Sequence, residues 1–170
     1  MVLLGIGSNL NSNFGNRFMN IDIAISYLEQ YEIKLIKKSS YYESLSYPDP
    51  TKPKFINVVI EVSTSLPPED LASVLIYVEE KLERKRNQKN EPRTCDIDII
   101  DYEGKNINFR YKNLDFTVPH EKLDCRNFVL IPLQEILPNW IHPKSKEKIS
   151  TLLKKLSVED RKSILKIKKN

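Results

Sequence analysis

Two aspartates separated by a single residue are the strongest sign of chemistry in this sequence. Asp96 and Asp98 occur in the run PRTCDIDII. Successive side chains of a strand point to opposite faces, so an extended chain would turn both carboxylates to one side and Ile97 to the other. Neighbouring carboxylates repel each other unless a cation or a bound proton relieves the repulsion, and hard oxygen ligands suit magnesium. The spacing therefore predicts a magnesium site whose remaining ligands are waters and substrate phosphates.

Several cations lie shortly upstream of the two aspartates, at Arg84, Arg86, Lys89 and Arg93. A D-x-D pair taken alone is more often two solvated aspartates on the exposed face of an edge strand. Acidic metal ligands beside several cations are what a triphosphate needs, because the metal bridges its oxygens while guanidinium groups take the remaining charge. The combination predicts an enzyme that handles nucleotide phosphates on divalent metal ions.

The composition is that of one soluble folded domain. A chain of 170 residues fits a single domain over residues 1–170, and 40% hydrophobic with 29% charged residues is too apolar for a disordered protein. The net charge of +4, from 27 basic and 23 acidic residues, favours anionic ligands without demanding nucleic acid. There is no membrane-length apolar stretch and no basic start of a signal peptide, so we expect a cytoplasmic protein. Cys95 and Cys125 lack metal-ligand spacing and are expected to be reduced thiols.

Apolar periodicity predicts the elements that must hold the aspartates. Strands are expected at residues 2–6, 33–42, 55–62 and 95–102. Two helices are expected between them, and their apolar stripes are Phe14, Phe18, Ile21, Ile25 and Leu28 in the first and Leu71, Val74, Leu75, Val78 and Leu82 in the second. The βαββαβ order is that of a ferredoxin-like α+β sandwich, in which helices pack on an antiparallel sheet.

The segments between and after these elements are also patterned. Residues 47–53, YPDPTKP, contain three prolines and predict an exposed semi-rigid loop, while residues 83–92 are polar, mostly basic and expected to be mobile. Glu103-Gly104 predicts a hairpin turn from the fourth strand into residues 107–109. Short helices are expected at 128–136 and 149–156. We therefore expect a core at residues 1–143, followed at 144–170 by a helix and a solvated basic end containing Lys162, Lys166, Lys168 and Lys169.

Five separated segments, in the same order, resemble one known family. PRTCDIDII with its upstream basic loop is joined by GIGSNL near the start, SSYYES at residues 39–44, VPH at 118–120 and RNFVLIPL at 126–133. Over residues 1–143 the chain is thus similar to hydroxymethyl-dihydropterin pyrophosphokinase of folate biosynthesis, a family with a ferredoxin-like fold. The resemblance implies transfer of pyrophosphate from ATP to the hydroxymethyl group of 6-hydroxymethyl-7,8-dihydropterin, with release of AMP.

The resemblance also implies roles at the phosphates. Asp96 and Asp98 would bind two Mg²⁺ ions, with ATP as co-substrate, and would be catalytic together with Arg84 and Arg93. The residues implied in ATP binding are Glu79, Arg84, Arg86, Lys89, Arg93, Ile99, His120 and Arg126. Two of these have ordinary alternatives, because an exposed helix glutamate explains Glu79 equally well and a lone histidine such as His120 is more often structural.

A second implied set would bind the flat pterin ring, which needs aromatic faces and a few fixed polar partners. Its members are Ser44, Leu45, Tyr47, Phe55, Asn57, Asp96 and Phe128. Phe55 and Phe128 would sandwich the ring, although plain core packing is the better guess for any single phenylalanine. An amide inside an apolar strand must find a partner, which favours a role for Asn57.

The chain departs from the family pattern at two places. Lys89-Asn90-Glu91 stands where many relatives carry an aromatic residue and a glycine, so closure of the basic loop over the ligands can differ. Cys95 replaces the usual aliphatic residue before Asp96, a small apolar change that should be tolerated.

Two other classes of protein were weighed. An RNA-binding sheet of this topology would carry the motif K/R-G-F/Y-G/A-F-V, which is missing here, and a purely structural domain would not need charges clustered around D-x-D. Gly5-Ile6-Gly7 is not a dinucleotide-binding motif, since Leu10 stands where the third glycine should be. We therefore expect small-molecule substrates and neither nucleic acid nor membrane as partners. The residues leave open whether the chain is monomeric or is fused to, or associated with, other folate enzymes.

Overall fold

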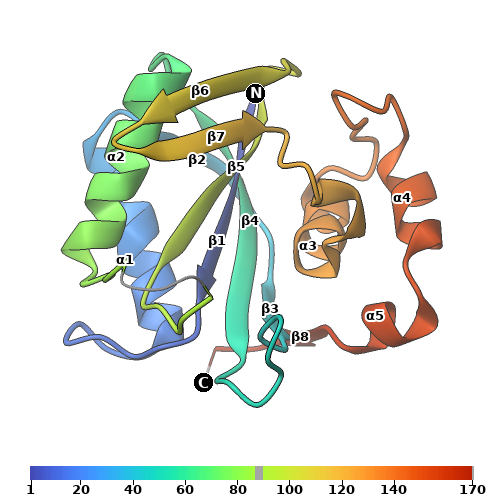
Figure 1. Cartoon of the computed structure of the whole chain (residues 1–170), viewed down its shortest axis with the longest axis horizontal. Coiled ribbons are helices and arrows are strands. Elements are labelled where there is room, and N and C mark those ends of the chain that lie inside the picture. The colour runs from blue at the N-terminus through green and yellow to red at the C-terminus, as the bar shows by residue number, and fades with distance from the viewer. Residues whose placement is uncertain (87–89, 170) are drawn as a thin grey trace.

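An antiparallel sheet of six strands lies at the centre of the computed structural model, which describes residues 1–86 and 90–169 (Figure 1). The strand order is β5-β1-β4-β3-β8, and β2 also pairs with β4. These strands are β1 (Val2–Ser8), β2 (Lys34–Lys38), β3 (Tyr41–Ser44), β4 (Phe55–Ser63), β5 (Asp96–Tyr102) and β8 (Leu165–Ile167). The helices are α1 (Arg17–Gln30), α2 (Pro68–Lys81), α3 (Asn127–Ile136), α4 (Ile149–Lys155) and α5 (Val158–Lys162), and a separate hairpin joins β6 (Ile107–Tyr111) to β7 (Leu114–Val118).

The predicted ferredoxin-like order is confirmed, but its second strand is broken in two. β2 pairs with the end of β4 and β3 pairs with its beginning, so both lie along the same edge. The break is bridged at Ser39, whose N–H donates to the Val59 carbonyl at 2.9 Å and whose hydroxyl accepts the Val59 N–H at 3.0 Å. A serine side chain thus replaces a ladder bond and lets the edge strand bend.

α1 and α2 cover one face of the sheet, as the apolar stripes predicted (Figure 1). The core between them contains Leu4, Ile6, Ile21, Leu28, Ile56, Ile60, Leu71, Leu75, Val78 and Ile97. One predicted member was wrong, because Phe14 precedes α1 and is exposed. The helix begins only at Arg17, after the Asn16 side chain has accepted the N–H of Met19 as an N-cap.

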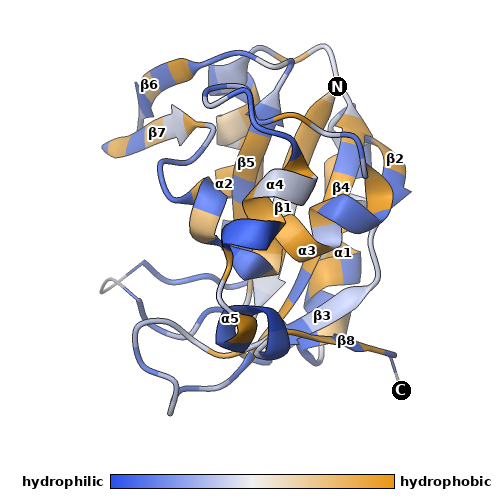
Figure 2. Cartoon of the chain, turned by 90° about the vertical axis from the view of Figure 1, so that its right-hand side faces the viewer, coloured by the Kyte–Doolittle hydropathy of each residue, from blue (hydrophilic) through white to orange (hydrophobic). Residues whose placement is uncertain are grey.

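α3 and α4 cover the opposite face, and both predicted C-terminal helices are confirmed to within a residue at each end. A second core lies between these helices and the sheet, formed by Leu3, Val59, Ile100, Leu130, Leu133, Trp140, Leu152 and Leu153. Figure 2 looks onto this side and shows α3 as mostly hydrophobic behind α4. The sheet is therefore buried on both faces. No helix within residues 1–86 and 90–169 is long and apolar enough to cross a membrane.

The hairpin predicted after the fourth strand was wrong in its pairing. The turn itself is present, since Glu103 and Gly104 have φ values of 54° and 69° and the Lys105 N–H reaches the Tyr102 carbonyl at 3.0 Å. β6 nevertheless pairs with β7 and not with β5. A second turn at Lys112 and Asn113, both at positive φ, joins β6 to β7, which the sequence reading had missed.

The four lysines of the basic end are exposed, as predicted, but the segment also contains a strand, β8, that was not predicted. β8 pairs with β3, so that Ile167 lies opposite Tyr41. Apolar Ile164 is buried and Ile167 packs against the first core. Within β8 and just after it, Ile167 turns to the protein while its neighbours Lys166 and Lys168 are exposed, which is the pattern of an edge strand with one face on the protein.

Candidate active site

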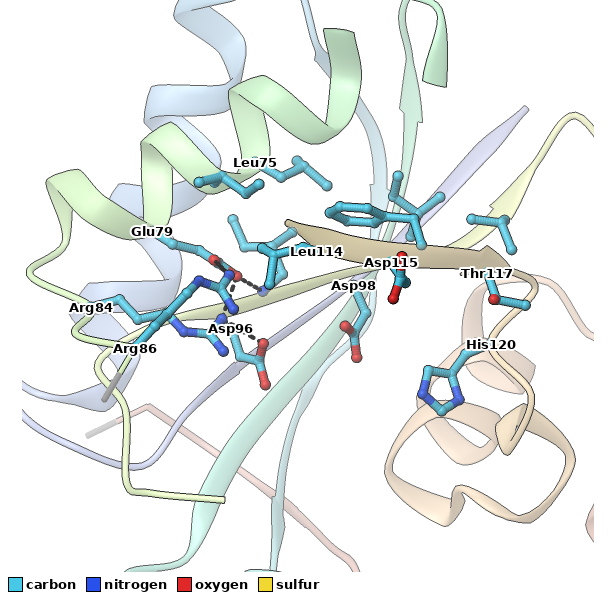
Figure 3. Close-up of a pocket in the computed structure, with 15 residues that line it drawn as sticks. Leu75, Glu79, Arg84, Arg86, Asp96, Asp98, Leu114, Asp115, Thr117 and His120 are labelled. Carbon is cyan, nitrogen blue, oxygen red and sulfur yellow. Dashed lines mark hydrogen bonds and ion pairs between the residues drawn. The ribbon is translucent and has the colours of Figure 1, made fainter. Parts of the chain in front are cut away.

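A pocket of about 420 Å³ opens between α2, β5 and β7 (Figure 3). Apolar side chains including Leu75, Ile99 and Leu114 line part of it. Charged and polar groups line another part, namely Glu79, Arg84, Arg86, Asp96, Asp98, Asp115, Thr117 and His120. Such a cavity can take a flat apolar ring at one end and an anion at the other.

The two aspartates share one side of β5, as the alternation of a strand requires. Ile97 and Ile99 point into the core with only 5% of their surface exposed. Asp96 and Asp98 lie on the opposite side, with 20% and 48% of their side chains exposed, and Figure 3 shows their carboxylates turned the same way. The sequence pattern thus predicted their relative orientation correctly.

Asp96 lies between two arginines that come from either end of the basic loop. Arg84 donates to its Oδ1 at 2.7 Å, and Arg93 donates to its Oδ2 from Nε at 2.6 Å and Nη2 at 2.5 Å. Burial acts to raise the pKa of Asp96, but the charges of Arg93 and Arg84 outweigh it and the pKa is lowered. Asp96 is therefore a carboxylate at neutral pH.

Asp98 has fewer arginine partners than Asp96. Arg126, just before α3, donates to its Oδ2 at 3.1 Å. Burial and the neighbouring charge of Asp96 raise the pKa of Asp98, while Arg126 opposes the shift. An added cation beside the two carboxylates would relieve this repulsion.

The two carboxylates suit a magnesium ion that arrives bound to phosphate better than an ion held by protein ligands alone. Each carboxylate oxygen has two lone pairs, so an oxygen that accepts an arginine can also face a metal. Among residues 1–86 and 90–169, no group of three or more His, Cys, Asp or Glu side chains could hold a metal ion. Magnesium commonly binds through one or two carboxylates, with waters and phosphates completing its shell, and the donors here fit that mode.

Glu79 anchors the start of the basic loop to β5. Its side chain is only 2% exposed, so the alternative of an exposed helix glutamate was wrong. One oxygen accepts Arg84 at 2.5 Å and the N–H of Ile97 at 2.7 Å, and the other accepts Arg86. Burial raises the pKa of Glu79 to about 7, against the opposing charge of Arg84. The residue thus acts through the arginines, which it holds beside Asp96.

The other end of the basic loop is fixed by Asn9, to which sequence reasoning gave no individual role. Its Oδ1 accepts the N–H of Arg93 at 2.7 Å, and its own N–H donates to the Arg93 carbonyl at 3.0 Å. Its Nδ2 also donates to the Pro53 carbonyl at 3.0 Å, in the proline-rich loop. Asn9 therefore joins the end of β1, that loop and Arg93. Lys89 lies outside the described residues, so its predicted role and the predicted mobility of the loop stay predictions.

His120 and Arg126 come together beside Asp98. Arg126 Nη2 lies 3.1 Å from His120 Nε2, while His120 Nδ1 accepts the N–H of Lys122 at 3.0 Å. Burial and the charge of Arg126 lower the pKa of His120. The imidazole is therefore neutral at pH 7 and lines the far end of the pocket in Figure 3.

Three residues predicted for the ring site meet over Gly7 of β1. Asn57 is buried, and its Nδ2 donates to the hydroxyl of Ser44 at 2.9 Å, which supplies the partner expected for an amide in an apolar strand. A Cβ placed on Gly7 would lie 3.3 Å from Asn57 Oδ1 and 3.4 Å from a ring carbon of Phe55. A side chain at residue 7 would therefore crowd the Asn57 amide and touch the Phe55 ring.

The two predicted ring-binding phenylalanines each contact an arginine of the charged site. The guanidinium of Arg93 lies 5.0 Å from the ring centre of Phe55, and that of Arg126 lies 5.6 Å from the ring centre of Phe128. Both phenylalanines are half-buried, and Phe55 belongs to neither apolar core, so core packing does not account for it. The aromatic pair thus adjoins the aspartates through these arginines.

Leu45 and Tyr47 are the least enclosed of the predicted residues, with 47% and 79% of their surfaces exposed. Their place after β3 is the observation that supports a role in the ring site. Conversely, several β7 residues that line the pocket had not been predicted as site residues, namely Leu114, Asp115, Phe116, Thr117 and Val118. The signal that could have found β7 is the Lys112-Asn113 turn, which the two short strands flank.

Comparisons with known proteins agree on one family. The sequence model of 7,8-dihydro-6-hydroxymethylpterin-pyrophosphokinase, abbreviated HPPK, matches residues 3–138. A 2-amino-4-hydroxy-6-hydroxymethyldihydropteridine pyrophosphokinase of Aquifex aeolicus is 40% identical over 142 residues, covering 84% of this chain and 83% of the relative. A Synechocystis protein of the same name is 34% identical over 148 residues, covering 86% and 73%.

Other similar proteins are much longer than this chain. A folic acid synthesis protein of Dictyostelium discoideum is 38% identical over 143 residues, which are 84% of this chain but 20% of that protein. The crystal structure of Plasmodium falciparum HPPK-DHPS with pteroate superposes with a TM-score of 0.72 over 91% of this chain and 44% of its own. At 15% sequence identity, this last likeness shows the fold alone.

Proposed function

Because the chain belongs to the 7,8-dihydro-6-hydroxymethylpterin-pyrophosphokinase family, we propose that it transfers pyrophosphate from ATP to the hydroxymethyl oxygen of 6-hydroxymethyl-7,8-dihydropterin. It is thus an ATP-dependent pyrophosphokinase of folate biosynthesis. In the reaction, the acceptor oxygen attacks the β-phosphorus of ATP, AMP leaves, and the hydroxyl proton is released. The observation that carries the proposal is the pair Asp96 and Asp98 on one side of β5, framed by Arg84, Arg93 and Arg126.

ATP binding is assigned to the pocket between α2, β5 and β7. The base would pack among apolar residues such as Ile99 and Leu114, with the phosphates directed toward Asp96 and Asp98. Arg84 and Arg93 would donate to the phosphate oxygens, where planar guanidinium groups match oxyanion geometry. The remaining ATP contacts are assigned to Glu79, Arg86, Lys89, His120 and Arg126, with Glu79 acting through the arginines that it holds.

The acceptor site is assigned to the neighbouring surface over Gly7. Phe55 and Phe128 would hold the two faces of the pterin ring, since each phenylalanine adjoins an arginine of the phosphate site. Ser44 and Asn57 would bond its polar edge, and Leu45 and Tyr47 would border it from the loop after β3. Held in this way, the hydroxymethyl group would point toward Asp96, with its oxygen close to the transferred phosphate.

Asp96 and Asp98 are assigned as ligands of two Mg²⁺ ions. Bound there, the ions would neutralise phosphate charge and keep the attacking oxygen in line with the leaving group. The support is the chemistry of the donor set, two carboxylates on one side of a strand with arginines ready for the uncoordinated phosphate oxygens. Two similar Arabidopsis thaliana proteins are named folate synthesis bifunctional proteins, which supports the alternative of fusion to, or association with, another folate enzyme.

Incubation with ATP, Mg²⁺ and 6-hydroxymethyl-7,8-dihydropterin tests the function directly. AMP is expected to form in equal amount to pyrophosphorylated pterin, measured by chromatography. Removal of Mg²⁺ with a chelator should stop AMP formation, and added Mg²⁺ should restore it. The reason is that the carboxylates are proposed to bind the phosphates of ATP through Mg²⁺. Formation of ADP in place of AMP, or turnover that survives chelation, would contradict the assignment.

Replacing Phe55 by alanine tests the acceptor site. Loss of one stacking face should raise KM for the pterin by roughly tenfold or more, since stacking on an aromatic side chain contributes about 1–3 kcal/mol. KM for ATP should change little. Tyr31→Ala removes an aromatic ring paired with Tyr77 at the end of α1 and serves as the matched control. A larger change in KM for ATP than for the pterin would argue against the assignment of Phe55.

A further inference from the structure

The last segment of the chain leads back to the ring site. The family match ends at residue 138, but the chain continues through α4 into a segment that we call the C-terminal strap, residues 157–169. The strap contains α5 and β8 and passes from beside α3 to the sheet edge at β3 (Figure 1). In Figure 2, α5 and β8 lie along the same end of the molecule as β3. The strap therefore connects two elements that carry predicted pterin-binding residues.

The first half of the strap holds the start of α3 through Asn127. α5 is capped by Ser157, whose hydroxyl accepts the Asp160 N–H at 2.9 Å. Within α5, the Asp160 carbonyl accepts Asn127 Nδ2 at 2.6 Å, and just after the helix the Ser163 hydroxyl accepts the same nitrogen at 3.0 Å. The Asp160 carbonyl also accepts the Ser163 hydroxyl at 2.9 Å, so Asn127, Asp160 and Ser163 form one hydrogen-bonded group between α3 and the strap.

Asn127 is the residue between Arg126 and Phe128. The N-cap of α3, Arg126, makes no side-chain capping bond, so the strap supplies a polar anchor where α3 begins. Arg126 has partners of its own in Asp98 and His120. Phe128 carries no polar group, so its ring position depends on the backbone and on packing. Loosening Asn127 should therefore displace Phe128 more than Arg126.

The second half of the strap fixes β3. β8 pairs with β3 along Tyr41, Tyr42 and Glu43, directly before Ser44. Lys166 of β8 also donates at 3.1 Å to Glu135 of α3, whose carboxylate accepts the hydroxyl of Tyr42 at 2.8 Å. The strand that presents Ser44 to Asn57 is thereby held from its outer edge and from α3.

We propose that the C-terminal strap is a positioning element of the pterin site, acting on Phe128 through Asn127 and on Ser44 through β3. The inference rests on the proposed function. Asn127 and Ser163 are positioning residues here, because neither is assigned a contact with substrate. The strap sets how tightly the acceptor binds, while ATP binding depends on side chains that the strap does not hold.

The test compares Asn127→Ala, Ser163→Ala and the double variant. Each single change should raise KM for the pterin by roughly three- to tenfold, the effect of one or two lost hydrogen bonds. KM for ATP should stay within about twofold, and the double variant should be little worse than Asn127→Ala, because the two residues share one contact. Lys155→Ala is the matched control, since it removes the ion pair that this α4 residue, outside the strap, makes with Glu147.

Direct binding separates positioning from general stability. Pterin affinity, titrated by pterin fluorescence with a non-hydrolysable ATP analogue present, should fall in the variants in parallel with KM. Wild-type protein that forms no AMP would refute the proposed function. Wild-type turnover together with unchanged pterin KM in both variants, or with equal shifts in both KM values, would overturn the strap inference alone. Should Asn127→Ala fail to fold, Ser163→Ala decides, because it changes only the strap.

Discussion

Replacing Asp98 by asparagine is expected to lower kcat for AMP formation by about 10³-fold or more, since a metal clamp supplies several kcal/mol to the transition state. The change keeps the shape of the side chain and removes its charge. Asp98 is the cleaner target of the two aspartates, because Asp96 accepts two arginines whose loss of a partner would also disturb the fold. Nearly half of the Asp98 side chain is exposed, so the variant should fold normally.

Two measurements keep loss of chemistry apart from loss of structure. The thermal unfolding midpoint of Asp98→Asn should match that of the wild type within a few degrees. Binding of Mn²⁺ with a non-hydrolysable ATP analogue, followed by electron paramagnetic resonance, should weaken. Glu29→Gln, which removes an exposed carboxylate from α1, is the control for a change of one charge and should retain full activity. If Asp98→Asn formed AMP at the wild-type rate, the assignment of Asp98 to the active site would be wrong.

Replacing Glu79 by alanine is expected to have the largest effect on stability. The side chain is almost fully buried and accepts Arg84, Arg86 and the N–H of Ile97. Removing one member of a buried charge pair costs about 3–5 kcal/mol, because the partner charge stays buried without compensation. For a chain of this length, such a loss lowers the unfolding midpoint by roughly 10 °C.

Urea unfolding followed by circular dichroism measures this loss. Glu80→Ala, the exposed neighbour on the same helix, should change the free energy of unfolding by less than about 0.5 kcal/mol. Activity should fall as well, because Arg84 loses the carboxylate that fixes it beside Asp96. If Glu79→Ala were as stable as Glu80→Ala, the hydrogen-bonded arrangement around Ile97 would not exist in solution.

The buried position of Glu79 also changes how its place in the sequence is understood. An exposed helix glutamate and an organiser of the basic loop had been equally good interpretations of one acidic residue in α2. The structure separates them, since Glu79 bonds β5 as well as two arginines. The periodicity of α2 could not separate them, because it shows which residues share a stripe and not where a loop folds back.

Local patterns determined much of this protein. Alternation in the run of residues 95–102 placed Asp96 and Asp98 on one side of a strand, and the two apolar stripes gave the helices that cover one face of the sheet. The order of elements was enough to predict the ferredoxin-like sandwich. Such features follow from the sequence because the strand and helix periods, 2 and 3.6, are properties of neighbouring residues.

Only the tertiary structure decided which distant segments meet. The pairing of β6 with β7, the return of β8 to β3 and the bonds from Asn9 to Arg93 join residues whose local sequence does not specify a partner. The same holds for the burial of Glu79 and for the bond between Asn127 and α5. Hydrogen bonds and strand edges are satisfied by whichever group the packed fold brings near, so these contacts depend on the whole chain and not on the spacing of residues within a segment.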